Sequence, residues 1–195
     1  MRRHAAAFYA RAQAAGYDLR PDQSLGWLTR YGHLQADVRA SLPRPVLEAL
    51  ASIFAELGGD ERALRAKTRG AMTTDFMLSP DAHLVEYDER SHFTTARLST
   101  FAYYPPDAPL GYDSHAYLEL CEVHCDRGDR GFAHKTAVEF PGAGGRARQR
   151  AYFDAFRDLA APTLERGPVL RVASPDEDPD IGLDRFKRCL AIAAI

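Results

Sequence analysis

The sequence predicts a single domain of the α/β class in its α+β form, on three observations. Residues 4–57 carry helix formers and apolar residues at helical spacing. Residues 71–88 carry two short runs of β-branched, aromatic and aliphatic residues, and residues 147–173 carry a helical pattern followed by an apolar strand. A domain typically holds ~100–200 residues, and the chain has 195.

The composition is that of a globular protein, with 46% hydrophobic and 27% charged residues. The apolar runs are far shorter than the ~18 residues that a membrane span needs, so we expect no membrane partner. Arg11 and Gln13 interrupt the N-terminal segment too early for a signal peptide and favour an amphipathic helix. Three cysteines, an odd number, do not form a disulfide framework, so a reducing cytoplasm is the expected compartment.

The charge is unevenly distributed along the chain, although the net value is only −2. Residues 1–70 hold 11 basic and 7 acidic residues, a net of +4, and residues 71–195 hold 14 and 20, a net of −6. The whole molecule is therefore not a basic nucleic-acid binder. A basic part beside an acidic part fits a DNA-holding surface next to a metal site, and it fits chance equally well.

The first 70 residues are predicted to form a helical extension that packs on a core of residues 71–195. We expect helices over residues 5–15, 24–42, 46–57 and 62–70. Gly16 is typical of a helix end, Ser24 of an N-cap, and Pro43 of a helix stop.

The core is predicted to begin with a hairpin of two antiparallel strands, AMTTDFML and AHLVEY, joined by the turn Ser79-Pro80-Asp81. After it, residues 94–147 read as an insertion. The expected elements are a short helix at 94–101, a loop at 102–112, a helix at 113–125, a turn at 125–131, a helix or strand near 132–139, a flexible break at 141–146, a helix at 147–160, a strand at 167–173, a loop at 173–182 and a helix at 183–191.

Three carboxylates are expected to meet on the hairpin. Glu86 and Asp88 are two apart on a strand and share a face, and the partner strand brings Asp75 beside them. Such a cluster is tolerable where a divalent cation neutralises it, and Mg²⁺ (or Mn²⁺) suits hard oxygen ligands. His92 follows closely, as a general base or as a group that orients water or phosphate. These features suit phosphodiester hydrolysis.

The alternative is that such acidic residues are solvated turn and strand-end groups, which applies best to Asp81, Asp88 and Glu89. Asp75 and Glu86 argue against it, because both interrupt otherwise apolar strands.

The segment TDFMLSPDAHLVEYDERSHF resembles the core motif of very-short-patch-repair-type endonucleases, a branch of the PD-(D/E)XK (restriction-endonuclease-like) nuclease superfamily. There, a strand ending in DF, a turn, an apolar strand, Glu-x-Asp and a nearby His form the metal site. A second segment, QRAYFDAFRDLAAPTLERGPVLRVAS, is similar to the later part of that motif, with Asp154, Arg157 and Asp158 at the helix positions. The resemblance implies a mixed sheet flanked by helices and a metal-dependent nuclease acting on DNA.

The sequence departs from the family pattern in two places. Glu89 and Arg90 stand where the relatives have glycine after Glu-x-Asp. Asp88 stands where the superfamily has its lysine, so a catalytic lysine lies elsewhere or is not needed. Residues 1–70 match no part of the family motif.

Lys135 is a candidate for that displaced lysine, as a point charge near the scissile phosphate, with a solvated lysine as the alternative. Gln149 and Arg150 open a helix after a Gly-rich break and could place basic groups and a helix N-terminus against nucleic-acid phosphates. The alternative there is a flexible loop with solvated arginines. Arg157 is expected to pair with the carboxylate cluster or with phosphate, and Asp154 to approach the metal site.

Cys121, His124 and Cys125 lie at i, i+3 and i+4, so all three can share a helix face. With a fourth ligand they could hold zinc, although the spacing is not that of a Cys-x-x-Cys knuckle. Buried cysteines are the alternative.

The first hypothesis is thus a Mg²⁺-dependent endonuclease-like enzyme acting on DNA, whose N-terminal helices hold substrate or form a homodimer. The second is a catalytically inactive module that kept the fold and binds nucleic acid or protein; the altered Asp88 and Glu89 positions favour it. A structural zinc protein is the third.

Overall fold

The computed structural model describes residues 3–67, 70–80, 83–165 and 167–194. Its helices are α1 (Arg3–Ala14), α2 (Ala36–Ser41), α3 (Arg44–Glu56), α4 (Glu61–Arg65), α5 (Thr95–Thr100), α6 (Ser114–Arg130), α7 (Gly145–Leu164) and α8 (Pro179–Ala193). Its strands are β1 (Leu19–Pro21), β2 (Ser24–Thr29), β3 (Ala71–Thr73), β4 (Phe76–Leu78), β5 (His83–Glu89) and β6 (Leu170–Ser174).

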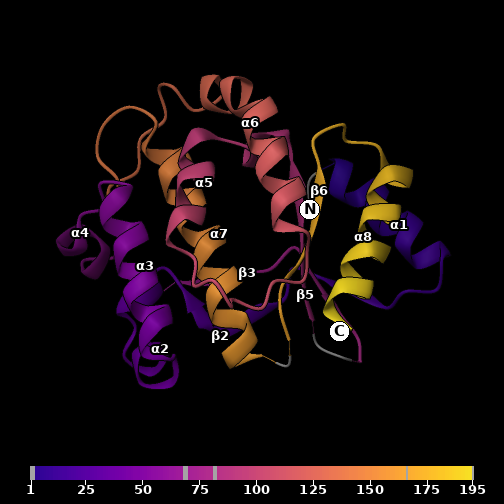
Figure 1. Ribbon diagram of the computed structural model, residues 1–195, viewed down its shortest axis with the longest axis horizontal. Helices are drawn as coiled ribbons and strands as arrows, with labels where there is room; N and C mark the ends of the chain where they lie inside the picture. The colour runs from indigo at the N-terminus through magenta and orange to yellow at the C-terminus, as the bar shows by residue number, and fades with distance from the viewer. Residues whose placement is uncertain (1–2, 68–69, 81–82, 166, 195) are drawn as a thin grey trace.

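The strands form a mixed sheet of four strands in the order β1-β4-β5-β6 and a separate pair, β2-β3. β4 and β5 form the predicted antiparallel hairpin, and β6 lies parallel to β5 in the register Glu86↔Arg171 and Asp88↔Ala173. Asp81 of the predicted turn lies outside the described residues. A mixed sheet with helices on both sides (Figure 1) confirms the α+β class.

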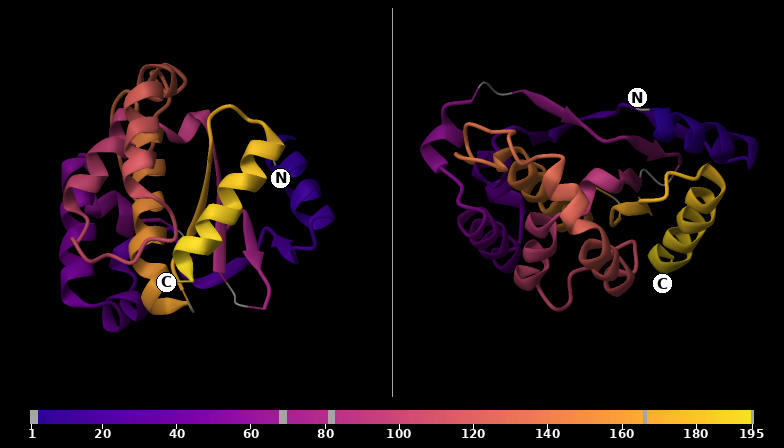
Figure 2. Two further views of the ribbon diagram at one scale, coloured as in Figure 1. Left: turned by 45° about the vertical axis from the view of Figure 1, so that its right-hand side comes forward. Right: turned by 90° about the horizontal axis from the view of Figure 1, so that it is seen from above.

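The two faces of the sheet differ in chemistry. On β5, Val85 and Tyr87 belong to an apolar cluster with α1 and α8, which pack together on one side of the sheet (Figures 1 and 2). The alternate residues, Glu86 and Asp88, point to the other side, where Glu86 pairs with Arg157 of α7 and Asp88 is linked to Asp158 of α7 through Arg171 of β6. The sheet therefore joins α7 through charged groups and joins α1 and α8 through apolar ones.

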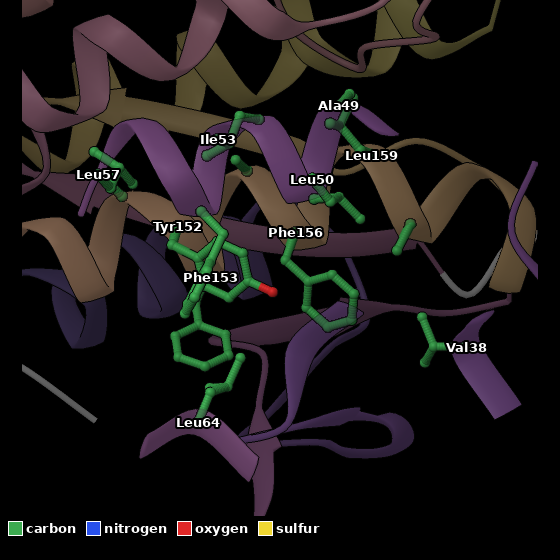
Figure 3. Close-up of a cluster of buried hydrophobic side chains, with 14 of the residues drawn as sticks. Val38, Ala49, Leu50, Ile53, Leu57, Leu64, Tyr152, Phe153, Phe156 and Leu159 are labelled. Atoms are coloured by element: carbon green, nitrogen blue, oxygen red, sulfur yellow. The ribbon is translucent and has the colours of Figure 1, made fainter. Parts of the chain in front are cut away.

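α7 is the central helix of the second half of the molecule. Its apolar residues pack against α3 in a cluster that includes Leu50, Ile53, Tyr152 and Phe156 (Figure 3). Nearly every residue from Ala151 to Ala161 is buried, whichever face of the helix it occupies, because α7 has the sheet on one side and α3 and α5 on others. No helix in the described part of the chain is long and apolar enough to cross a membrane.

The predicted helix at 24–42 is wrong over its first part. Residues 24–29 form β2, and the helix begins only at Ala36. Residues 19–29 run antiparallel to residues 71–78, pairing first with β4 and then with β3. The extension at 1–70 thus contributes β1 to the main sheet, and pairing with a distant segment overrides local helix propensity.

The predicted strand at 71–78 is interrupted in the middle. Thr74 and Asp75 bend the chain, so that β3 pairs with β2 and β4 joins the four-stranded sheet. Thr74 stabilises the bend by donating its hydroxyl to the Phe76 carbonyl oxygen at 3.0 Å. Asp75 therefore lies just before a strand and not inside one. The direction of its side chain is not set by the alternation of side chains along a paired strand.

The turn predicted at 125–131 is also wrong, since α6 continues through it to Arg130. The predicted loop at 173–182 is shorter than expected because α8 begins at Pro179. Residues 132–139 contain neither a helix nor a named strand, only the bridge between Ala137 and Phe140. The helices expected at 5–15, 46–57, 94–101 and 147–160 and the strand at 167–173 are confirmed within a few residues.

Candidate functional site

A small polar pocket of about 170 Å³ lies where α7 meets β3, the bend at Asp75 and β5. Its charged and polar walls are formed by the carboxylates of Asp75, Glu86 and Asp154, the guanidinium groups of Arg146, Arg150 and Arg157, and the side chains of His92, Gln149 and Thr73. Groups of both charges therefore share one cavity. We call it the carboxylate pocket.

Glu86 is the carboxylate of the pocket whose pKa is raised. Its side chain is only 4% exposed, and burial raises its pKa to about 7. Arg157 opposes the shift, with Nε 3.3 Å from Glu86 Oε1, while Asp75 and Asp154 add to it. Glu86 Oε1 is nevertheless buried without a hydrogen-bond partner among the described residues. A buried acceptor in this state favours a ligand that brings positive charge.

Asp75 is held beside Glu86 by the backbone. Its Oδ2 accepts a hydrogen bond of 3.0 Å from the amide of Tyr87, the residue after Glu86. Its carbonyl oxygen accepts another, also of 3.0 Å, from the amide of Asp22. The bend before β4 and the adjacent strand together fix this carboxylate at the pocket.

Asp88 lies behind the pocket wall and does not line it. Its Oδ2 accepts hydrogen bonds from Tyr117 at 2.7 Å and from Arg171 Nη1 at 2.9 Å, and its Oδ1 lies 2.9 Å from His92 Nδ1. Burial acts to raise the pKa of Asp88, but Arg171 and His92 hold it well below the ordinary value. Both oxygens already have cationic partners, so Asp88 is poorly suited to bind a metal ion.

His92 connects Asp88 to the pocket. Its Nδ1 also lies 3.3 Å from Asp154 Oδ2, so one ring nitrogen faces two carboxylates. Burial acts to lower the pKa of His92, but Asp88 raises it above the ordinary value. Burial likewise opposes the shift of Asp154, whose pKa is lowered chiefly by Arg171. The two carboxylates beside Nδ1 therefore favour the imidazolium form of His92.

The arginine wall is partly fixed by backbone oxygens. Arg157 donates to the carbonyl oxygens of Phe153 at 3.2 Å and Thr73 at 3.3 Å. Arg150 donates to Ser91 Oγ at 2.6 Å. Arg146 is exposed at the start of α7. Its guanidinium has no acidic partner in the described part of the chain.

The pocket brings together most of the site residues predicted from the sequence. Asp75, Glu86, His92, Gln149, Arg150 and Arg157 all line it. Asp88 is set back behind His92, and Lys135 is exposed with its ammonium over the Phe132 ring and does not line the pocket. Cys121 is buried in the core and the Cys125 thiol donates to the Glu122 carbonyl oxygen, and within the described residues neither belongs to a group of three or more side chains that could hold a metal ion.

A buried charge network next to the pocket was missed from the sequence. Asp158 on α7 accepts hydrogen bonds from Arg97 and Arg171, each at 2.6 Å. Arg171 in turn pairs with Asp88. The available signal was an arginine in the middle of the apolar strand GPVLRVA, since a charge in a buried strand requires buried partners.

We asked whether the pocket fits a divalent cation. No group of three or more His, Cys, Asp or Glu side chains within the described ranges is arranged to hold a metal ion. Two hard oxygen ligands are nevertheless present, since Asp75 and Glu86 line one cavity and Glu86 Oε1 lacks a hydrogen bond. Mg²⁺ commonly binds through one or two carboxylates and completes its shell with water and phosphate oxygens. The donor set fits that mode of binding.

Comparison with known proteins adds one finding. Residues 52–190 match the model of a family described as "Family of unknown function (DUF7255)". The chain belongs to this family. The DUF7255 region contains every residue that lines the carboxylate pocket. No significant match was found among curated proteins or among solved structures.

Proposed function

We propose that this DUF7255 protein is a metal-dependent phosphodiester hydrolase of the restriction-endonuclease-like kind, acting on nucleic acid, with DNA as the expected substrate. The observation that carries the proposal is the meeting of Asp75 and Glu86 with three arginines in one small pocket. Carboxylates supply oxygen ligands for a hard cation, and arginines bind phosphate oxygens through paired hydrogen bonds. Phosphodiester hydrolysis uses both.

The arrangement of the two motif segments supports the same proposal. Residues 74–93 provide Asp75, Glu86 and His92, and residues 149–174 provide Gln149, Arg150, Asp154 and Arg157. The segments are more than 50 residues apart along the chain, yet side chains from both line the carboxylate pocket. The mixed sheet flanked by helices is compatible with the resemblance from which the nuclease fold was expected.

Different residues of the pocket are expected to bind the metal ion, bind the phosphate and donate a proton. A divalent cation held by Asp75 and Glu86 would neutralise charge on the phosphate and lower the pKa of a bound water. Arg157 is already oriented by Thr73 and Phe153 and donates to a phosphate oxygen without reorganisation. Asp88 raises the pKa of His92, which favours the protonated imidazole and a role as proton donor to the phosphate or the leaving oxygen.

A second candidate is a module that binds nucleic acid without cleaving it. The observation that favours it is the state of Asp88, which stands at the superfamily's lysine position and is fully engaged by Arg171, Tyr117 and His92. Arg157 also pairs with Glu86, so a guanidinium could take the place of a metal ion. In that case the pocket would hold phosphate and leave it intact.

The test is calorimetric titration with Mg²⁺ and Mn²⁺, with plasmid nicking measured in the same samples. The wild type is expected to bind one metal ion and nick the plasmid, and Glu86→Gln is expected to lose both. Binding should strengthen from pH 6 to pH 8, because the metal ion must displace a proton from a carboxyl group whose pKa is about 7. Glu119→Gln, at an exposed carboxylate on α6, is the matched control.

Three outcomes separate the candidates. Metal binding and nicking that vanish together in Glu86→Gln support the hydrolase. Nucleic-acid binding without nicking in either metal favours the binding module. Equal metal binding by Glu86→Gln and the wild type would overturn the assignment of the carboxylate pocket.

A further inference from the structure

A second cavity, of about 300 Å³, adjoins the carboxylate pocket. The two share five lining residues, which are Met72, Thr73, Arg146, Gln149 and Phe153. The second cavity is completed by Arg30, which follows β2, by Lys67, and by Ala71, the first residue of β3. We call the two together the trough. The two cavities therefore lie side by side at the N-terminal end of α7, with the five shared residues between them.

The two ends of the trough differ in charge. Three carboxylates line the carboxylate pocket, whereas the described residues that line the second cavity include none. Arg30 and Arg146 are exposed, and no ion pair or hydrogen bond of their side chains occurs in the described part of the chain. Lys67 is 18% exposed and pairs with the buried Glu139. The second cavity is thus a basic extension of a site that carries the acidic ligands.

Gln149, which lines both cavities, is held in place by one hydrogen bond and has one buried acceptor without a partner among the described residues. Gln149 is 8% exposed, and its Nε2 donates to Glu139 Oε1 at 2.5 Å. The same Glu139 oxygen holds Lys67, so one buried carboxylate fixes two side chains of the second cavity. Gln149 Oε1 is buried without a hydrogen-bond partner among the described residues. An unsatisfied acceptor at this depth favours a bound donor group or an ordered water.

We propose that the trough binds successive phosphates of one nucleic-acid strand. The carboxylate pocket takes the scissile phosphate, and Arg30 and Arg146 bind the phosphate next to it. The substrate is therefore an oligonucleotide strand, not a mononucleotide or a small phosphodiester. The placement of the scissile phosphate rests on the hydrolase function proposed above. The basic extension stands on its own charge and geometry.

The chemistry of the two ends accounts for this choice of ligand. A ligand with a single phosphate in the carboxylate pocket could contact Arg146, which lines both cavities, but would leave the guanidinium of Arg30 without an anion. A polyanion with regularly spaced phosphates places one charge at each end, and arginine contacts to phosphate fix the register of the strand. Arg30 comes from residues before the DUF7255 match, which gives the N-terminal part of the chain a role in holding substrate.

The experiment measures binding in EDTA, where hydrolysis does not occur, by fluorescence anisotropy of labelled DNA and RNA strands. Arg30→Ala is compared with Arg127→Ala, which removes the same charge from an exposed position on α6 outside the trough. We expect Arg30→Ala to weaken binding several-fold. It should also reduce the magnitude of the slope of log K, where K is the association constant, against log[salt] by about 0.7. This is the change expected when one phosphate contact to a single strand is lost. Arg127→Ala should change neither quantity.

Competition by short strands tests the two-phosphate geometry directly. In the wild type, affinity should rise at least fivefold from a strand with one phosphodiester to a strand with two. In Arg30→Ala that rise should disappear. Equal effects of Arg30→Ala and Arg127→Ala, or no rise from one phosphodiester to two, would overturn the trough.

The two proposals fail in different ways. Arg30-dependent binding by a protein that hydrolyses no strand supports the trough as a binding groove and overturns the hydrolase. Metal-dependent hydrolysis with no dependence of strand binding on Arg30 overturns the trough and leaves the hydrolase standing. Preference for the DNA or the RNA strand in the same assay identifies which polymer the trough accepts.

Discussion

Glu86 and Asp88 are two apart on β5 and face the same side of the sheet, and burial acts to raise the pKa of both, but their net pKa shifts have opposite directions. The Arg157 guanidinium lies 3.3 Å from the Glu86 carboxylate, and burial raises the pKa of Glu86 to about 7. Asp88 has Arg171, His92 and Tyr117 around it, and its pKa stays well below the ordinary value. The number of cationic partners decides which of two neighbouring carboxylates can accept a proton or a metal ion.

His33 provides the prediction at the scale of one residue. It is 3% exposed, its Nδ1 lies 2.6 Å from the Tyr152 hydroxyl, and burial lowers its pKa to about 4. In the unfolded chain the imidazole binds a proton near pH 6.5, whereas in the folded protein it stays neutral down to about pH 4. The stability of the folded protein is therefore unaffected by this group above pH 6.5 and decreases as the pH falls towards 4. His33 alone should therefore reduce the free energy of unfolding by about 2 kcal/mol between pH 7 and pH 5.

Urea denaturation at the two pH values checks this prediction. In His33→Gln the decrease in the free energy of unfolding between pH 7 and pH 5 should be smaller than in the wild type by about 2 kcal/mol. This difference does not depend on how the substitution changes packing, because both pH values are measured on the same variant. His115 is exposed, so His115→Gln should show the same decrease in the free energy of unfolding between pH 7 and pH 5 as the wild type. An unchanged loss in His33→Gln would show that another group controls the acid sensitivity.

At the scale of one element, α6 shows how packing decides where a helix ends. The sequence CDRGDRG has the composition of a turn, but α6 runs through Gly128. A methyl group at Gly128 would overlap the carbonyl oxygen of Phe93, so the glycine permits a close approach between α6 and the segment after β5. Glycine is used here for contact and not for chain reversal.

Gly128→Ala should therefore destabilise the protein although alanine is the better helix former. The gain in helix propensity is ~1 kcal/mol, and overpacking against a backbone atom costs ~1–3 kcal/mol. We expect a net loss of up to about 2 kcal/mol in the free energy of unfolding, measured by urea denaturation. Gly26→Ala, where the added methyl group meets nothing within 4 Å, should change stability by less than about 0.5 kcal/mol. A more stable Gly128→Ala variant would contradict this account.

At the scale of the whole molecule, a buried charge network joins the sheet to the helices. Asp158 on α7 binds Arg97 of α5, Arg171 of β6, and the hydroxyls of Tyr104 and Tyr112 at 2.7 and 2.8 Å. Through Arg171 the network reaches Asp88, His92 and the carboxylate pocket. The packing of α7 on the sheet and the position of the pocket wall therefore depend on the same ion pairs.

Asp158→Asn should be strongly destabilising, because it leaves two fully buried guanidinium groups without their shared counter-charge. Breaking a buried ion pair by removing one partner costs ~3–5 kcal/mol, whereas an exposed pair contributes less than ~1 kcal/mol. Glu48→Gln, which breaks the exposed pair with Arg44, is the control and should be nearly neutral. Similar denaturation midpoints for the two variants would show that the network adds little to stability.

The sequence alone was sufficient for the elements with strong local patterns. The hairpin β4-β5 follows from two apolar runs around a turn, and α3 and α7 follow from helical spacing. Asp75 and Glu86 could be proposed as partners because carboxylates that interrupt apolar strands require a reason to be buried. Only the tertiary structure decided that residues 24–29 form a strand, since its partner, β3, lies more than 40 residues away.

The same distinction separates the two halves of the site. Glu86 lies on the β4-β5 hairpin and Asp75 lies just before it, so the hairpin pattern was enough to predict that these two carboxylates are close together. The state of Asp88 depends on Arg171, 83 residues later, and the basic extension depends on Arg30, which reaches α7 only through the pairing of β2 with β3. Local patterns determine conformation over a few residues, whereas charge neutralisation depends on which distant side chains the fold brings within a few ångströms.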